Sequence, residues 1–102
     1  IGVCGFSDMG RLYCDRQDRL ITQSFVHRTH WDIFGYYYPK EIMNWFCDDY
    51  ITEVYGALNL SLYSPIYCIA NKGGEPRYDI VHCKKLCDKL VLRDIEKLKL
   101  YL

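Results

Sequence analysis

The chain lacks an excess of charge of either sign, a long apolar run and any repeat or low-complexity tract. Thirteen Lys and Arg residues balance thirteen Asp and Glu residues, so the formal net charge is zero. Neutrality removes the usual electrostatic case for binding nucleic acid or an anionic membrane. The longest uncharged run, 54–71, is too polar and too broken by Gly56 and Pro65 to cross a bilayer. We therefore expect no nucleic-acid partner and no membrane span.

The composition is that of one small globular domain. Half of the 102 residues are hydrophobic and 16% are aromatic, which is enough to build a single core. The chain opens directly in a strand-like run, residues 1–6, with neither a charged leader nor a signal-like apolar block before it. We expect residues 1–102 to be a fragment cut from a longer protein.

The cysteines are too few and too irregularly spaced for a small disulfide scaffold. They stand at positions 4, 14, 47, 68, 83 and 87. Reduced thiols, and with them an intracellular, cytoplasmic setting, are the favoured interpretation. Cys83 and Cys87 lie four residues apart in a helical pattern beside His82, so they either bind a metal from one helix face or pack as small apolar residues.

Short β-like runs alternate with helical patterns, which predicts an α/β fold. The expected strands are 1–6, 21–26 and 63–70. The expected helices are 29–35, 39–44, an acidic-headed helix at 49–58 and a long C-terminal helix at 79–102, with a turn at 72–76. We expect Thr29 and Asp48 to be N-caps, and Gly35 to end the first helix in a left-handed conformation.

Two of the expected helices have an apolar face at helical spacing. In 49–58 this face is formed by Ile51, Val54, Tyr55 and Leu58. In 79–102 it is formed by Ile80, Cys83, Cys87, Leu90, Val91, Ile95, Leu98 and Leu102.

Asp48 and Asp49 are the best candidates for acid-base chemistry. Adjacent carboxylates repel each other, so one of them can have a raised pKa and act as a base near neutrality. The positive end of the helix that they head opposes this effect, because it favours the ionised form. In the alternative interpretation, Asp48 only caps the helix and Asp49 only lies on its first turn.

A second group of titratable residues surrounds the short helix at 29–35. His27 and His30 are three residues apart with Asp32 nearby, which fits either a metal site or ordinary core and surface histidines. Arg28 lies beside an acidic third of the chain. It either clamps a phosphate or carboxylate or forms an ion pair with Asp32 or Asp49.

Eight aromatic residues fall within twenty positions of the sequence. Flat rings with polar edges suit the faces of sugars, but the same rings are also ordinary core material. The eight are Trp31, Phe34, Tyr36, Tyr37, Tyr38, Trp45, Phe46 and Tyr50.

The order of these motifs resembles the second half of a GT-A glycosyltransferase, a member of the nucleotide-diphospho-sugar transferase superfamily. A strand is followed by His27-Arg28, a short helix closing at Gly35, an aromatic loop, and Trp45-Phe46-Cys47-Asp48-Asp49 heading a helix. The opening run 1–5 resembles the strand after that family's metal site, and Arg77-Tyr78 after a Gly-rich turn is similar to the tail of some members.

The resemblance implies a Rossmann-like GT-A domain of which residues 1–102 are the C-terminal, acceptor-side part. Such an enzyme transfers a sugar from a nucleotide-diphospho-sugar to a hydroxyl group of a glycan or protein acceptor. Asp49 would be the catalytic base and Asp48 its acidic companion. The implied substrate-binding residues are Trp45, on the acceptor side, together with Tyr37, Arg28 and His27.

One family motif is absent from the chain. GT-A enzymes bind a divalent ion, Mn²⁺ or Mg²⁺, through an Asp-x-Asp motif, and no two of the nine Asp residues here are two apart. We therefore expect the metal only in a full-length enzyme, and no turnover by this chain alone. The alternative function is a non-catalytic α/β module that binds a carbohydrate or a protein.

Overall fold

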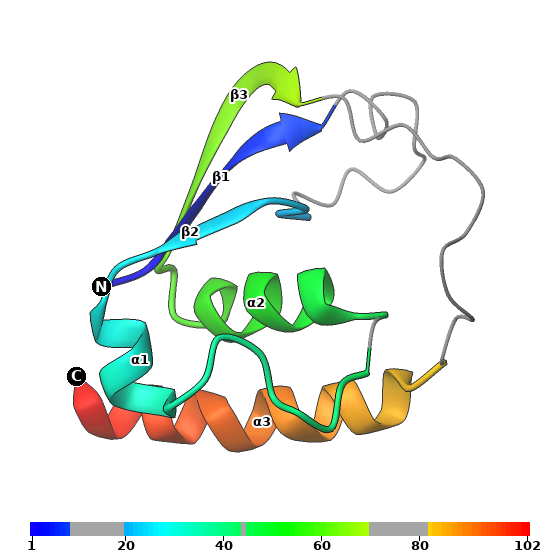
Figure 1. The fold of residues 1–102 in the computed structure, drawn as a ribbon. Helices are drawn as coiled ribbons and strands as arrows, with labels where there is room; N and C mark the ends of the chain where they lie inside the picture. The colour runs from blue at the N-terminus through cyan, green and yellow to red at the C-terminus, as the bar shows by residue number, and fades with distance from the viewer. Residues whose placement is uncertain (9–19, 44, 70–81) are drawn as a thin grey trace.

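A computed structural model describes residues 1–8, 20–43, 45–69 and 82–102. In this structure the helices lie on one side of a small sheet (Figure 1). In chain order the elements of these residues are β1 (Val3–Asp8), β2 (Ser24–Val26), α1 (Thr29–Phe34), α2 (Cys47–Gly56), β3 (Ser61–Ile69) and α3 (Lys84–Tyr101). The predicted mixed α/β class is confirmed.

The described strands form one sheet in the order β2-β1-β3. The central strand, β1, runs antiparallel to β2 and parallel to β3, so that Val3 pairs with Val26 on one side and with Ser61 on the other. The register of β1 and β3 shifts after Phe6, at the point where β3 contains Pro65, which has no N–H to donate to the ladder.

The two faces of the sheet differ because side chains alternate along each strand. In β1 the inward positions Val3, Gly5 and Ser7 are buried, while Cys4 and Phe6 are exposed on the outer face. A Cβ atom at Gly5 would collide with the buried side chain of Ile21, so this inward position has room only for glycine.

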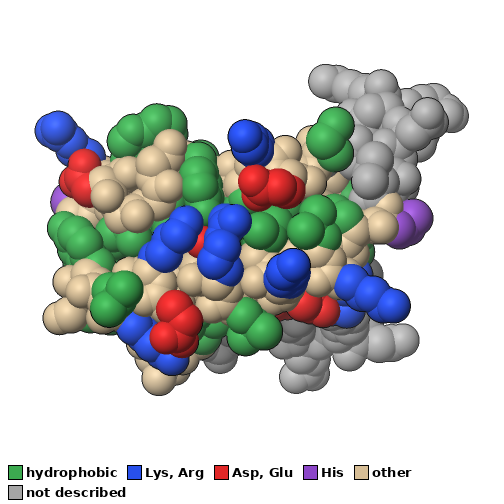
Figure 2. All heavy atoms as spheres, turned by 90° about the horizontal axis from the view of Figure 1, so that it is seen from below, with side chains coloured by type: hydrophobic (Ala, Val, Ile, Leu, Met, Phe, Trp, Pro, Cys, Tyr) green, Lys and Arg blue, Asp and Glu red, His purple; other side chains and the backbone are tan. Residues whose placement is uncertain are grey.

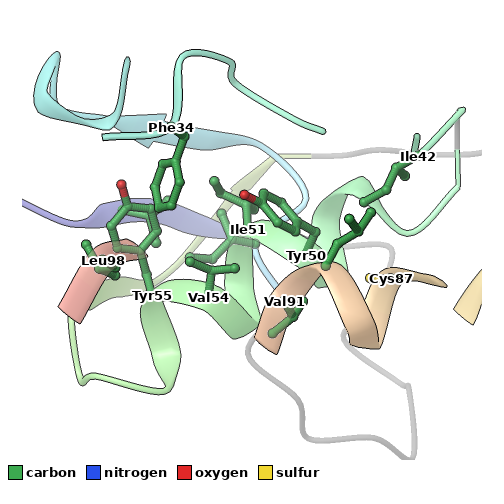
Figure 3. Packing of buried hydrophobic residues seen from close by; sticks show 12 residues of the cluster. Phe34, Ile42, Tyr50, Ile51, Val54, Tyr55, Cys87, Val91 and Leu98 are labelled. Carbon is green, nitrogen blue, oxygen red and sulfur yellow. The ribbon is translucent and has the colours of Figure 1, made fainter. Parts of the chain in front are cut away.

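Helix α2 lies between the sheet and α3 and supplies much of the core (Figure 1). The predicted residues Ile51, Val54 and Tyr55 are buried, and Tyr50, absent from the predicted face, is buried with them. The fourth predicted residue, Leu58, lies beyond the end of α2 and is half-buried. Figure 3 shows these side chains packed against Cys87, Val91 and Leu98 of α3 and Phe34 of α1.

The predicted apolar stripe of α3 is confirmed in its central part. Cys87, Leu90, Val91 and Leu98 are buried, whereas Leu102 is exposed. Ile95 is half-buried, Cys83 is the N-cap residue rather than part of the helix, and Ile80 lies outside the described residues. The buried set also includes Asp94, a charged residue that the stripe did not contain.

Several predicted boundaries differ from the structure. The second strand covers Ser24–Val26 rather than 21–26, and the third begins at Ser61 rather than 63. The described part of the long helix begins at Lys84. The turn at 72–76 and Arg77-Tyr78 lie outside the described residues.

The predicted helix 39–44 is wrong over residues 39–43. These form only one turn, closed by a hydrogen bond of 3.0 Å from the Ile42 N–H to the Pro39 carbonyl. Gly35 ends α1 in the left-handed conformation, φ 76°, as predicted. Thr29 is not the N-cap, since it already belongs to the helix and Arg28 precedes it with helical backbone angles.

Candidate functional site

The acidic pair lies in the first turn of α2. Both carboxylates are half-buried, and the helix begins at Cys47, so the predicted N-cap role of Asp48 is wrong. Phe46 occupies the N-cap position with φ 75° and caps the helix with no side-chain hydrogen bond. Asp48 and Asp49 are therefore placed where the helix dipole stabilises negative charge.

The backbone of Phe46 is strained. A bulky residue in the left-handed region is an outlier that costs about 1–3 kcal/mol, and such strain concentrates at functional sites. Two thiols of the α3 N-terminal region help to hold it. The Cys87 Sγ donates to the Phe46 carbonyl at 3.7 Å, and the Cys83 Sγ donates to the Trp45 carbonyl at 3.6 Å.

The two carboxylates face different surroundings. Burial, followed by the charges of Glu53 and Asp49, raises the pKa of the Cys87 thiol to about 12, so the Asp49 carboxylate acts on a thiol of α3. Burial likewise raises the pKa of Cys47, with the charge of Asp48 as the next cause. Asp48 thus acts on a thiol of its own helix turn, whereas Asp49 acts on a thiol of the neighbouring helix.

Trp45 lies directly before this strained turn and is 43% exposed. A hollow of about 660 Å³ opens next to it, between Phe46 and the start of α3, and is lined further by residues 82–86. Neither Asp48 nor Asp49 lines this hollow. The structure therefore places Trp45 and the acidic pair at the same end of α2. All three residues lie beside the hollow and do not line it.

His27 and Arg28 lie at the other end of α2. Both are exposed at the start of α1, and His27 lines an open hollow of about 500 Å³ together with Asn59 and Leu60, which follow the C-terminus of α2. Figure 1 shows that α1 and the first turn of α2 are at opposite ends of the molecule. The structure does not bring these two predicted substrate-binding residues next to Asp49.

Tyr37 is tied into the fold. Its hydroxyl donates to the Ser24 carbonyl at 2.8 Å, and its own carbonyl accepts a hydrogen bond of 3.0 Å from the His30 Nε2. The other ring nitrogen of His30 lies 2.7 Å from the Tyr55 hydroxyl, so with Nε2 protonated it is the acceptor. Burial lowers the pKa of His30, which is consistent with a neutral core histidine whose nitrogens are both occupied.

The eight aromatic residues do not form one platform. Phe34 and Tyr50 are buried, whereas Trp31, in α1, and Trp45, before α2, are 60% and 43% exposed. The remaining rings are half-buried: Tyr36, Tyr37, Tyr38 and Phe46. Only Trp45 combines exposure with a place beside the acidic pair.

Sequence reasoning missed a buried ionic cluster around Asp94. The carboxylate accepts hydrogen bonds from the Tyr36 hydroxyl at 2.7 Å and the Tyr50 hydroxyl at 2.8 Å. Arg93 donates to both of its oxygens, and Lys97 lies 3.1 Å away. Burial alone would raise the pKa of Asp94, but these bonds outweigh it and hold the pKa at about 2. A signal was present in the sequence, because Asp94 stands four residues from both Leu90 and Leu98 and so lies on the apolar side of the helix.

No family model matches the chain, and neither does any curated protein or solved structure. None of the helices among the described residues has the length and hydropathy needed to cross a bilayer. The same residues bring no three His, Cys, Asp or Glu side chains together as a metal site. Cys4, Cys47, Cys83 and Cys87 are free thiols, while the predicted intracellular setting stays a prediction.

Proposed function

We propose that the chain is the acceptor-side part of a GT-A glycosyltransferase that moves a sugar from a nucleotide-diphospho-sugar to an acceptor hydroxyl. The observation that carries this proposal is the left-handed Phe46, φ 75°. A strained bulky residue two positions before a pair of carboxylates, with its carbonyl bonded to the Cys87 thiol of α3, supports a functional role for that turn.

In this proposal Asp49 is the base. It takes the proton of the acceptor hydroxyl while that oxygen attacks the anomeric carbon of the sugar, and the nucleoside diphosphate leaves. A base in hydrogen-bond reach contributes about 10²–10⁴-fold to the rate. The exposed Trp45 ring gives the acceptor an apolar face to stack on, and Asp48 adds negative charge beside the base.

The nucleotide sugar would be bound by another part of the enzyme. The outer face of the sheet supports a second body packed on this one, because it carries large apolar side chains in contact with water. Phe25 is 56% exposed, Leu62 73% and Ile66 63%. Uncovered apolar surface of this kind marks an interaction site. In this proposal the divalent ion is also held by that other part of the enzyme.

The same apolar face favours a second candidate function, a non-catalytic module that binds a carbohydrate or a protein. In that case the acidic pair is only a stabilising feature of the helix start. Titrating the isolated chain with oligosaccharides and with nucleotide sugars separates the two candidates. Binding of oligosaccharide by a chain whose parent protein transfers no sugar would favour the module.

The decisive experiment is the substitution Asp49→Asn in the full-length parent protein. We expect the transfer rate to fall by about 10²-fold or more, since the amide cannot accept the proton. Asp32→Asn is the matched control, because Asp32 is an exposed carboxylate of α1. Equal transfer rates for the Asp49→Asn variant and the unaltered enzyme would remove Asp49 from the base role.

A further inference from the structure

Helix α3 carries a row of basic side chains that runs from its exposed side at Lys85 to the edge of the core at the half-buried Lys97. Lys85, Lys89, Arg93 and Lys97 recur every four residues, so they follow one another along one side of the helix. Figure 2 views the molecule from the α3 side and shows Lys and Arg side chains in a line across this face. The zero net charge of the chain therefore hides a local concentration of positive charge.

Acidic neighbours neutralise only part of this row. Asp94 is shared by Arg93 and Lys97, and the charge of Glu41 also acts on Arg93. Within the part of the chain that the structure describes, Lys85 and Lys89 form no ion pair. The uncompensated charge is therefore concentrated in the N-terminal half of α3.

Exposed leucines accompany the basic row. Leu92 follows Lys89 by three residues and is 68% exposed, and Leu100 follows Lys97 by three residues and is 89% exposed. Residues three apart on a helix are surface neighbours, so both leucines lie next to the row. Leucines between long basic side chains suit a bilayer interface, where the leucine enters the acyl boundary and the lysine amine reaches the phosphates.

We propose that this face of α3 binds the surface of an anionic bilayer. The face consists of Lys85, Lys89, Arg93, Lys97, Leu92 and Leu100, and it includes one acidic residue, Glu96, which is paired with Lys99. Lys85 and Lys89 contact anionic headgroups and the two leucines insert between them, while Arg93 and Lys97 stay bonded to Asp94 at the edge of the face. A nucleic acid would use the same basic side chains but gains nothing from the leucines, which is why the combination favours a lipid surface. The inference goes beyond the proposed function and is independent of the acidic pair.

The test is co-sedimentation of the chain with vesicles of phosphatidylcholine alone and with vesicles that also contain phosphatidylserine. We expect binding only to the second kind. It should weaken as ionic strength rises from about 0.1 M to about 1 M, which shortens the Debye length from about 10 to about 3 Å. Lys85→Gln combined with Lys89→Gln should weaken binding about thirtyfold, since each basic residue contributes about a factor of five.

The matched control removes two charges from elsewhere on the same helix. Lys84→Gln with Lys99→Gln changes the net charge equally, but these lysines are paired with Asp88 and Glu96. We expect this variant to bind like the unaltered chain. Equal weakening by both pairs would mean that net charge alone matters, which would overturn the proposal, as would absence of binding to phosphatidylserine vesicles at low salt.

The leucines distinguish a lipid surface from a soluble polyanion. Leu92→Asn with Leu100→Asn should weaken vesicle binding and leave binding to a DNA oligonucleotide unchanged. Both side chains are exposed, so the fold does not depend on them. Vesicle binding that is insensitive to this pair of substitutions would overturn the proposal in favour of simple polyanion binding.

Discussion

At the scale of single residues, the main stabilising feature is a carboxylate that is fully buried and fully bonded. Asp94 is 0% exposed, and its oxygens accept bonds from side chains of α2, of α3 and of the loop after α1. Removing one partner of such a cluster leaves buried polar groups without partners, which is costly. Asp94 therefore connects three parts of the chain that are distant in sequence.

The substitution Asp94→Asn should lower the free energy of unfolding by about 3 kcal/mol. The neutral amide no longer compensates the positive charges of Arg93 and Lys97. The measurement is urea unfolding followed by circular dichroism. Asp88→Asn is the control, since Asp88 forms an exposed ion pair with Lys84 and should cost less than about 1 kcal/mol. Similar losses for both variants would contradict the role given to Asp94.

At the scale of elements, the end of α1 and the start of α2 are set by a left-handed residue rather than by a side-chain cap. Gly35 ends α1 with φ 76°, and Phe46 begins α2 with φ 75°. A glycine adopts the left-handed region freely, whereas a phenylalanine does so only when its surroundings hold it there. The end of α1 is therefore encoded locally, and the start of α2 is not.

Substitutions at two glycines separate the cost of left-handed strain from the gain in helix propensity. Gly35→Ala should destabilise the protein by about 1–2 kcal/mol purely through left-handed strain, because a Cβ there meets no other atom within 4 Å. Gly56→Ala should instead stabilise by about 0.5–1 kcal/mol, since Gly56 is a residue of α2. Thermal unfolding of both variants checks the opposite signs, and a destabilised Gly56→Ala variant would contradict this explanation.

The contrast between locally encoded features and features that depend on distant residues explains what the sequence could predict. The buried face of α2, with Ile51 and Val54, follows from helical spacing, which is a local property. The start of α2 at Cys47 could not be predicted, because it depends on thiols of the α3 region that bond to the Trp45 and Phe46 carbonyls. The bonds that stabilise Asp94 were missed for the same reason, since the Tyr36 and Tyr50 hydroxyls come from other elements.

The candidate site was predictable only in part. The sequence placed Asp48 and Asp49 at a helix start and Trp45 before them, and the structure has all three at one end of α2. The distance between this end and the start of α1, with Arg28, depends on how the helices pack. The assignment of Asp49 as a base, and of the chain to a glycosyltransferase, stays a prediction.

At the scale of the whole molecule, two buried groups set how stability depends on pH. Burial keeps the pKa of His30 below its ordinary value of 6.5, and the pKa of Asp94 is about 2 instead of 3.8. For both groups the unfolded chain binds a proton first as the pH falls, so acid favours unfolding.

We expect the free energy of unfolding to decline in two windows. The first begins below about pH 6.5, from His30, and the second lies between about pH 4 and pH 2, where Asp94 accounts for about 2 kcal/mol. Urea unfolding at a series of pH values measures both. His30→Gln should abolish the first decline and leave the second, and a variant that keeps both would contradict this assignment.

The pairing of β1 with β3 has a consequence for the order of folding. Val3 pairs with Ser61 and Asp8 with Ile69, so the central strand meets its parallel neighbour only after β2, α1 and α2 have been synthesised. A nascent chain on the ribosome therefore holds β1 with one edge unpaired until β3 emerges. Because such long-range pairing is slow, completion of the sheet is a late step, and until then the open edge of β1 can pair with another chain.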